Sequence, residues 1–365
     1  ALQKLGSTIN VSSTLDGIRF TIQSLKKNVD ATLALVQERM FNPKFSEAAF
    51  NRIQKQRLEG FKQLKADPAA VADLVFAKMN YGAGNILGMD DGGTEHTIRN
   101  MKLQDIENYY ANYMTSQGVK VVVVGDVTQQ EIVPKLNFLS KLPNKKIVLP
   151  KPAGPATSID KTKVYLVDVP KAAQSQFRVG YSTGLKYDAT GDFYKASLMN
   201  YTLGGDFNSR LNLNLREDKG WTYGARSSFT ADEYSGDFEF SSGIRADATD
   251  SALVEVMKEM RNYAANGIKD EELRFMKNSL GQRDALRYET GPQKAGFIGR
   301  ILDYNLPANY VDQQNKILAS LTKEQVNATA RKMLNPDKMN ILLVGDKAKI
   351  LEGVKKLGYE IVELD

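Results

Sequence analysis

A long internal repeat constrains the fold of this chain more than any other feature. The segment "MKLQDIENYYANYMTSQGVKVVVVGDV" from Met101 aligns without gaps with "LTKEQVNATARKMLNPDKMNILLVGDK" from Leu321, at an offset of 220 residues. Each copy reads as an amphipathic helix, a short polar break and an apolar strand that closes on Gly-Asp. The same offset relates "DATLALV" from Asp30 to "DSALVEV" from Asp250. Self-similarity at a constant offset indicates two duplicated domains.

The repeat predicts the domain boundaries. The first repeat domain spans residues 1–141 and the second spans residues 163–365, with a linker at residues 142–162. The linker holds four prolines, which cannot donate ladder hydrogen bonds and keep the segment extended: Pro143, Pro150, Pro152 and Pro155. Because Ala1 aligns near Lys219, the first copy has no counterpart to the initial strand and helix of the second. We therefore expect an upstream piece that completes the first domain.

The order of elements predicts an α+β fold. Strand patterns are few and are separated by runs of helical pattern, which is typical of a mainly antiparallel sheet with helices packed on it. In residues 251–265 one helical face carries five large side chains that we expect in the core: Leu253, Val256, Met257, Met260 and Tyr263.

Composition excludes several classes of protein. The chain has one histidine, His96, in a polar and glycine-rich stretch that predicts a surface loop, and it has no cysteine. Zinc hydrolase sites normally use several histidines, and serine or cysteine catalysis usually needs a histidine base, so this chain alone is poorly equipped for the common hydrolytic routes. The net charge of +6 is spread along the chain rather than clustered, which disfavours a nucleic-acid binder. No apolar run is long enough to span a membrane.

The stretch "SRLNLNLREDKGWTYGARSS", residues 209–228, is the most specific part of the sequence. Leu211 and Leu215 stand at i, i+4, which predicts a helix. Asp206 or Asn208 can cap the start of this helix. Gly220 suits the left-handed residue after its end, and a strand is expected from the tryptophan that follows.

This arrangement gives two side chains a chemical role. Arg216 would lie in the last helical turn, where its charge suits the helix dipole, and Tyr223 would start the strand. Both can donate hydrogen bonds to a peptide carbonyl or to a developing oxyanion. The residues alone also allow a purely structural role, because arginines at helix ends and tyrosines in strands are common.

Several segments resemble the pitrilysin/insulinase family of zinc metallopeptidases, which includes mitochondrial processing peptidase. The resemblance is carried by "NSRLNLNLREDKGWTYGARSSF", "PKAAQSQFRVGY", "LMNYTLGG" and "ALQKLGSTINVSST". It implies the metallohydrolase fold of the mitochondrial processing peptidase type. In that family two halves close like a clamshell around a peptide. One half carries zinc on an H-x-x-E-H helix, and the other supplies an arginine–tyrosine pair that holds substrate and supports the transition state, here Arg216 and Tyr223.

The zinc motif of the family has no match in this chain. The corresponding helix of the second copy places Ala196, Met199 and Asn200 where the motif has His, Glu and His. Glu59 falls near the position of the family's third ligand, but we interpret it as a solvated helix residue. The resemblance therefore implies no metal site in this chain and a zinc ion on a partner half.

These observations predict the substrate-binding, zinc-free half of a zinc metalloendopeptidase, inactive by itself. Its partners would be a peptide and a zinc-bearing half, which is either a separate subunit or an N-terminal part of a longer chain. Two alternatives stay open: a structural core-type subunit of the same fold without protease activity, and a catalytic subunit whose zinc motif lies upstream of Ala1. The resemblance to this family implies a bacterial periplasmic or cell-envelope location.

Overall fold

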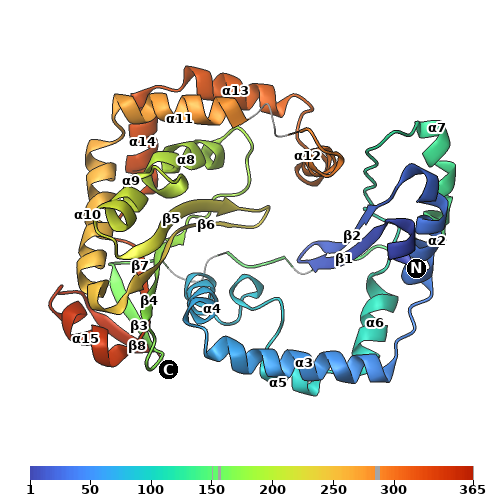
Figure 1. Ribbon diagram of the computed structural model, residues 1–365, viewed down its shortest axis with the longest axis horizontal. Coiled ribbons are helices and arrows are strands. Elements are labelled where there is room, and N and C mark those ends of the chain that lie inside the picture. The colour runs from blue at the N-terminus through green and yellow to red at the C-terminus, as the bar shows by residue number, and fades with distance from the viewer. Residues whose placement is uncertain (150, 155–157, 284–287, 365) are drawn as a thin grey trace. The chain divides into compact units, whose positions relative to one another are not determined.

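A computed structural model of the chain describes residues 1–149, 151–154, 158–283 and 288–364 (Figure 1). The chain divides into two compact units. Unit 1 comprises residues 1–58, 95–150 and 286–303, and unit 2 comprises residues 59–94, 151–285 and 304–365. These units follow packing contacts, whereas the predicted domain boundaries follow the repeat in the sequence and stay a prediction.

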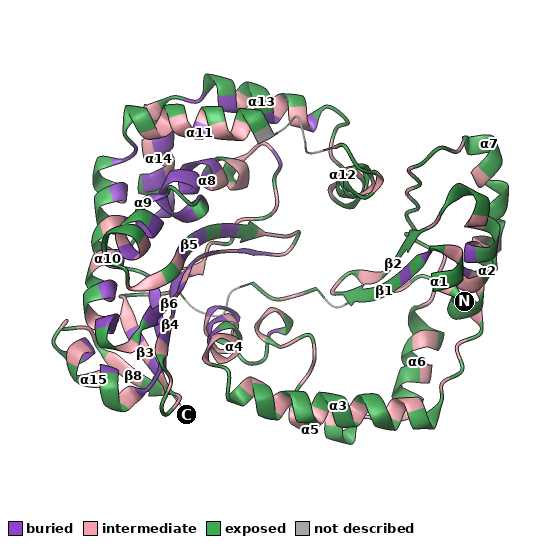
Figure 2. Ribbon diagram, in the orientation of Figure 1, coloured by how far each residue is buried: buried purple, intermediate pink, exposed green. Residues whose placement is uncertain are grey.

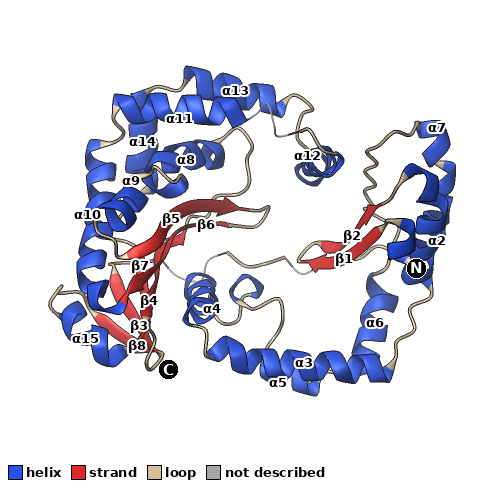
Figure 3. Cartoon of the chain, viewed as in Figure 1, coloured by secondary structure: helices blue, strands red, loops and turns tan. Residues whose placement is uncertain are grey.

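Unit 2 is built on one six-stranded sheet with the strand order β5-β6-β4-β7-β3-β8 (Figure 3). Its strands are β3 (Lys163–Asp168), β4 (Gln174–Ser182), β5 (Thr222–Ala231), β6 (Gly236–Arg245), β7 (Asn340–Gly345) and β8 (Ile361–Leu364). The β5–β6, β6–β4 and β4–β7 pairs are antiparallel, and the β7–β3 and β3–β8 pairs are parallel. The predicted α+β class with a mainly antiparallel sheet is confirmed.

One face of this sheet packs against helices to form the main core. The helices of unit 2 other than α4 are α8 (Asp192–Asn200), α9 (Arg210–Asn212), α10 (Thr249–Asn266), α11 (Asp270–Arg283), α13 (Tyr310–Ser320), α14 (Lys323–Met333) and α15 (Lys347–Lys355). Period-2 alternation sends Phe177 of β4 and Phe238 of β6 into the core. The five predicted core side chains of α10 are each at most 1% exposed, which confirms the predicted stripe. Each fully buried large side chain contributes roughly 1.5–3 kcal/mol.

Helix α4 (Pro68–Tyr81) packs on the other face of the same sheet. It starts where the Asp67 carboxylate accepts hydrogen bonds from two backbone N–H groups of the first turn, with proline in the first helical position. Its Phe76 is buried against Leu342 and Val344 of β7. The central strand β7 is therefore covered on both faces, which explains why all six of its residues are buried. Buried residues gather on the sheet of unit 2 and on helices such as α8 and α9 that pack against it (Figure 2).

Unit 1 contains a two-stranded antiparallel hairpin and helices. The strands are β1 (Thr8–Thr14) and β2 (Gly17–Gln23). The helices are α1 (Leu2–Leu5), α2 (Val29–Phe41), α3 (Glu47–Lys65, which continues into unit 2), α5 (Glu95–Asn100), α6 (Leu103–Tyr113), α7 (Gln129–Ile132) and α12 (Gly291–Tyr304), with a 3₁₀ helix at Pro134–Lys141. A small core joins the hairpin to α2 through Ile9, Val36, Met40 and Leu142. Of the predicted linker, Pro150 and residues 155–157 lie outside the described residues.

The apolar strand predicted in the first copy is not a strand in the structure. Residues 119–125 pair with no other strand of the described chain, and Val119, Val121 and Val123 are 46%, 48% and 43% exposed. The pattern alone was misleading because a strand needs neighbours that satisfy its backbone N–H and C=O groups.

Candidate functional site

Arg216 lies in a π-helix, Leu213–Asp218, which directly continues α9. Leu211 and Leu215 are both fully buried and anchor this segment to the core, as their i, i+4 spacing predicts. In a π-helix each backbone hydrogen bond spans one residue more than in an α-helix, and such segments are frequent at functional sites. The helix predicted for this stretch is confirmed, with a wider turn than the sequence suggested.

The predicted capping residues of this helix were wrong. The N-cap is Ser209, whose backbone is extended, and its side chain makes no capping hydrogen bond. The Asp206 carboxylate instead accepts hydrogen bonds from the Tyr201 hydroxyl at 2.7 Å and from the backbone N–H of Asn208 at 3.0 Å. Asp206 is buried, and these bonds fix the loop that precedes the helix.

The turn after the π-helix has the predicted geometry. Gly220 has φ of +64°, in the left-handed region that favours glycine, and its N–H donates to the Arg216 carbonyl at 3.1 Å. The N–H of Trp221 donates to the Leu215 carbonyl at 3.0 Å, which closes the helix end. Strand β5 begins at the next residue, so Tyr223 stands at the start of the strand as predicted.

Tyr223 is presented to solvent by an irregularity in the β5–β6 pairing. Thr222 pairs with Ile244, but the regular register resumes only at Ala225, which pairs with Ser242. A β-bulge of this kind re-aims the side chains of the bulged strand. The ring of Tyr223 is not packed against the core, and the residue is 91% exposed.

The Arg216 guanidinium is partly exposed and is held on two sides. Its central carbon lies 4.5 Å from the ring centroid of Phe207, and its Nε lies 3.3 Å from Oε1 of Glu217. Within the described residues, the terminal nitrogens of Arg216 donate no hydrogen bond, and Arg216 and Tyr223 do not bond to each other. Both side chains therefore keep donor groups available to a ligand.

The positions that correspond to the zinc motif are filled by the core. Ala196 and Met199 are fully buried, and Asn200 is 4% exposed. The Asn200 amide donates to the Ser227 carbonyl at 2.7 Å and accepts from the Ser227 hydroxyl at 2.6 Å. None of these side chains can ligate zinc in this setting, and the described residues contain no group of three or more His, Cys, Asp or Glu that could hold a metal ion. The residues at these three positions therefore do not fit a zinc ion.

Residues 100–280 match the peptidase M16 inactive domain. This chain contains a peptidase M16 inactive domain. It is 23% identical over 353 residues to the "non-peptidase homolog YmxG" of Helicobacter pylori, covering 95% of this chain and 79% of that protein. It is 22% identical over 342 residues to the "uncharacterized zinc protease YmxG" of Bacillus subtilis, covering 92% and 80%. The predicted relationship to the pitrilysin/insulinase peptidases, on their non-catalytic side, is confirmed.

Solved structures support the same assignment. A peptidase M16 inactive domain from Pseudomonas fluorescens is 27% identical, with a TM-score of 0.83 over 94% of this chain and 82% of that chain. The periplasmic protease PqqL from Escherichia coli shares the fold at 16% identity, with a TM-score of 0.76 over 94% of this chain and 38% of that chain. Among the described helices of this M16 chain, none has the length and apolar character needed to cross a bilayer.

Two other residues considered from the sequence lie on elements other than those that carry Arg216 and Tyr223. Glu59 lies on α3 with its side chain 56% exposed, and it pairs with Lys62 at 3.1 Å. His96 is exposed, but it lies in the short helix α5 rather than in the predicted loop, and its ring contacts the Asn100 amide at 3.2 Å. The interpretation of Glu59 as a solvated helix residue agrees with its exposure.

Sequence reasoning missed a cluster of charged groups around the buried Arg178, between α4 and the sheet. Arg178 of β4 is buried, and its terminal nitrogen lies 2.7 Å from the Asp73 carboxylate, while its Nε lies 3.5 Å from Glu239 of β6. Burial raises the pKa of Glu239 to about 7; Arg178 opposes this shift, and the nearby carboxylates of Asp73 and Asp237 add to it. The alternation of Arg178 and Glu239 with core phenylalanines was a usable signal, since it places both on the face opposite the main core.

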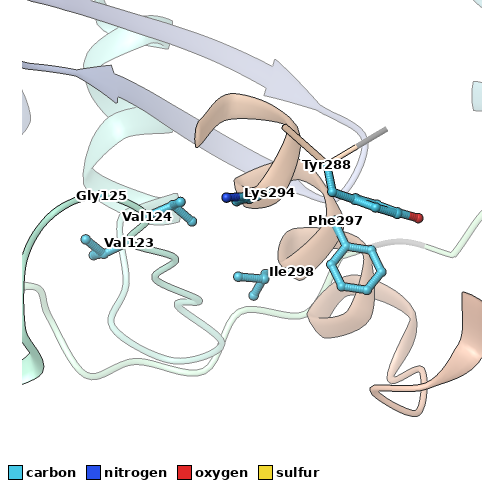
Figure 4. A pocket seen from close by; sticks show the side chains of 7 residues that line it. All are labelled: Val123, Val124, Gly125, Tyr288, Lys294, Phe297 and Ile298. Carbon is cyan, nitrogen blue, oxygen red and sulfur yellow. The ribbon is translucent and has the colours of Figure 1, made fainter. Parts of the chain in front are cut away.

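A second candidate region lies in unit 1. A cavity of about 500 Å³ is lined by Val123, Val124, Gly125, Tyr288, Lys294, Phe297 and Ile298 (Figure 4). Its lining is mostly apolar and joins helix α12 to the unpaired segment 119–125. Among the described residues that line it, Lys294 and Tyr288 are the titratable ones, and no carboxylate or histidine stands beside them. The Arg216–Tyr223 stretch is the stronger candidate in this M16 chain.

Proposed function

We propose that this chain is the substrate-binding, zinc-free half of an M16 zinc metallopeptidase. It would close as a clamshell on peptides and depend on a zinc-bearing half for hydrolysis. That half is a partner subunit or another part of a longer polypeptide. The chain alone is expected to bind peptide without cleaving it.

The exposure of Tyr223 carries this proposal. A tyrosine retained for stability buries its ring, because ring burial supplies most of the free energy that the residue can contribute. Here the residue is 91% exposed, on a bulge at the start of β5, which is an edge strand of the sheet. An exposed phenol that follows a helix with an arginine in its last turn is suited to ligand binding rather than to packing.

The chemistry available at Arg216 and Tyr223 fits a peptide substrate. The guanidinium offers a fork of N–H donors, and the phenol offers one O–H donor. In a closed complex these groups would hold a peptide carbonyl and stabilise the negative charge that develops on its oxygen. No step of bond cleavage is assigned to this chain, because its zinc-motif positions are occupied by Ala196, Met199 and Asn200.

The location proposed for this chain is the bacterial periplasm or cell envelope. A structural neighbour of the same fold, PqqL, is a periplasmic protease, which supports this proposal by analogy only. Secretion of the chain can be tested by fractionating cells that produce it from its native gene.

Reconstitution tests the function. The chain is mixed with an H-x-x-E-H-bearing M16 subunit from the same organism, and cleavage of a fluorescence-quenched peptide is followed. We expect activity only in the mixture. Arg216→Ala should lower kcat/KM by about 100-fold, as expected when one transition-state donor is removed. Tyr223→Phe, which removes only the hydroxyl, should lower it by a similar order.

A matched control is available on the same unit. Val254 on α10 is 47% exposed and is not placed at the site, so Val254→Ala should leave kcat/KM unchanged. If Arg216→Ala and Tyr223→Phe behave like this control, the two residues have no substrate role. Calorimetric titration of the isolated chain with the same peptide then separates a peptide-binding half from a structural subunit, which would bind none.

A further inference from the structure

The geometry points to Phe207 as a positioning residue for Arg216, an inference that rests on the proposed function of Arg216. Its ring provides a flat aromatic surface on which the guanidinium lies, so that the terminal nitrogens of Arg216 point to the substrate in a fixed orientation. Nothing in the family match or in the motif itself assigns this role.

The contact between the two side chains has the geometry of a cation–π interaction. The guanidinium carbon is 4.5 Å from the ring centroid, within the range in which the ring quadrupole attracts a cation. The Nε side of the same group faces Glu217 at 3.3 Å. With one face and the Nε edge occupied, the fork formed by the two terminal nitrogens is the part of the guanidinium left for a ligand. This fork is the element that binds carboxylates and carbonyls in a defined orientation.

Phe207 is itself held in a rigid loop. Its carbonyl accepts a hydrogen bond from the Asn212 amide at 2.7 Å. The residue before it, Asp206, is buried and is bonded to Tyr201 and to the N–H of Asn208. The Phe207 side chain is nevertheless 43% exposed, so it is available to contact the guanidinium at the surface. A rigid loop that leaves a phenylalanine exposed beneath an arginine is consistent with pre-organisation of that arginine.

The alternative is that Phe207 only stabilises the fold. Double-mutant analysis separates the two roles, because a residue that acts through Arg216 has no effect once Arg216 is gone. A residue that stabilises the fold lowers activity to the same extent in both backgrounds. The role of the aromatic surface can also be separated from that of side-chain volume, since leucine fills space without presenting a π-face.

The experiment measures kcat/KM of the reconstituted enzyme with the quenched peptide for Phe207→Ala, Phe207→Leu and Phe207→Trp, each with Arg216 and with Arg216→Ala. We expect Ala and Leu to lower kcat/KM by roughly two- to five-fold and Trp to retain it, which is the size of an exposed cation–π contact. In the Arg216→Ala background none of the three Phe207 substitutions should change kcat/KM further. The melting temperature of each variant is measured alongside, and it should not follow the activity order.

The outcomes are distinguishable. If Phe207→Leu retains activity while Phe207→Ala loses it, volume rather than the aromatic face matters and the inference is overturned. Equal losses in both Arg216 backgrounds would also overturn it. If Arg216→Ala itself has no effect, the proposed function fails, and the inference fails with it. If Arg216→Ala strongly lowers kcat/KM while Phe207→Ala leaves it unchanged, the proposed function is supported and only the role of Phe207 is overturned.

Discussion

Two segments of this chain share a pattern and differ in structure. In the repeat, "VVVVGD" from Val121 corresponds to "ILLVGD" from Ile341. The second is strand β7, paired with β3 on one side and β4 on the other and buried throughout. The first is an extended segment with no strand partner among the described residues, and alternate valines are more than 40% exposed. Apolar β-branched residues therefore specify the potential for a strand, and neighbouring strands decide whether it forms.

Hydrogen exchange should show the largest difference between these segments. The amides of Leu342, Leu343 and Val344 are in ladder hydrogen bonds at the centre of a sheet and should exchange only on global unfolding. The amides of residues 121–124 should exchange faster by about three orders of magnitude or more, given ordinary domain stability. Mass spectrometry of peptic fragments measures both. Equal protection would mean that segment 119–125 is paired in solution, and the comparison would fail.

Truncating matched side chains should give the next largest effect. Leu343 is fully buried, so Leu343→Ala should lower the free energy of unfolding by about 3 kcal/mol through lost burial and a cavity. Val123 occupies the equivalent position but is 43% exposed, so Val123→Ala should change it by less than about 0.5 kcal/mol. Urea denaturation of both variants checks this. A destabilisation at Val123 as large as at Leu343 would place that valine in a core.

A smaller effect concerns pH. Glu239 of β6 has a pKa raised to about 7 by burial, whereas an exposed glutamate titrates near 4.5. Between these values the folded state holds a proton that the unfolded state has lost, so this group makes stability fall as pH rises from about 4.5 to about 7, with no further change above that. By comparison, strand β2 of the unit 1 hairpin contains no acidic residue, so that strand has no group that could cause a similar pH dependence.

Glu239→Gln should remove the contribution of Glu239 to the pH dependence, so the stability of this variant should vary less between about pH 4.5 and about pH 7. Melting temperatures from pH 4.5 to 8 for the parent chain and the variant provide the measurement, with Glu47→Gln, at an exposed position, as the control. An unchanged slope in Glu239→Gln would show that the carboxyl is ionised in the folded state throughout, held by Arg178.

The sequence predicted much of unit 2. The α10 core stripe, the helix that carries Leu211 and Leu215, and the left-handed Gly220 were all correct, because each depends on local periodicity or on one residue's backbone preference. The capping residue was wrong, since the Asp206 carboxylate is used by Tyr201 and the N–H of Asn208 rather than by the first helical turn. A side chain with several possible partners cannot be assigned from spacing alone.

The sequence predicted which residues make up the candidate site, but not the local structure that holds them. Arg216 and Tyr223 were selected from the sequence, and their roles remain a proposal. The π-helix, the bulge and the Phe207 ring beneath Arg216 were not foreseen. Each depends on how a helix or strand is seated against its neighbours, which leaves no periodic signal in the sequence.

The amino-acid sequence by itself predicted an α+β fold, and it showed an internal repeat and the lack of the family's zinc-motif ligands. These properties follow from residue identity and spacing, which can be read without knowledge of the tertiary structure. Only the tertiary structure decided which apolar segment becomes a paired strand, that the zinc-motif positions are packed into a core, and that Tyr223 faces solvent. Pairing and burial depend on contacts between residues far apart in the chain, and those contacts exist only once the sheet and its helices are assembled.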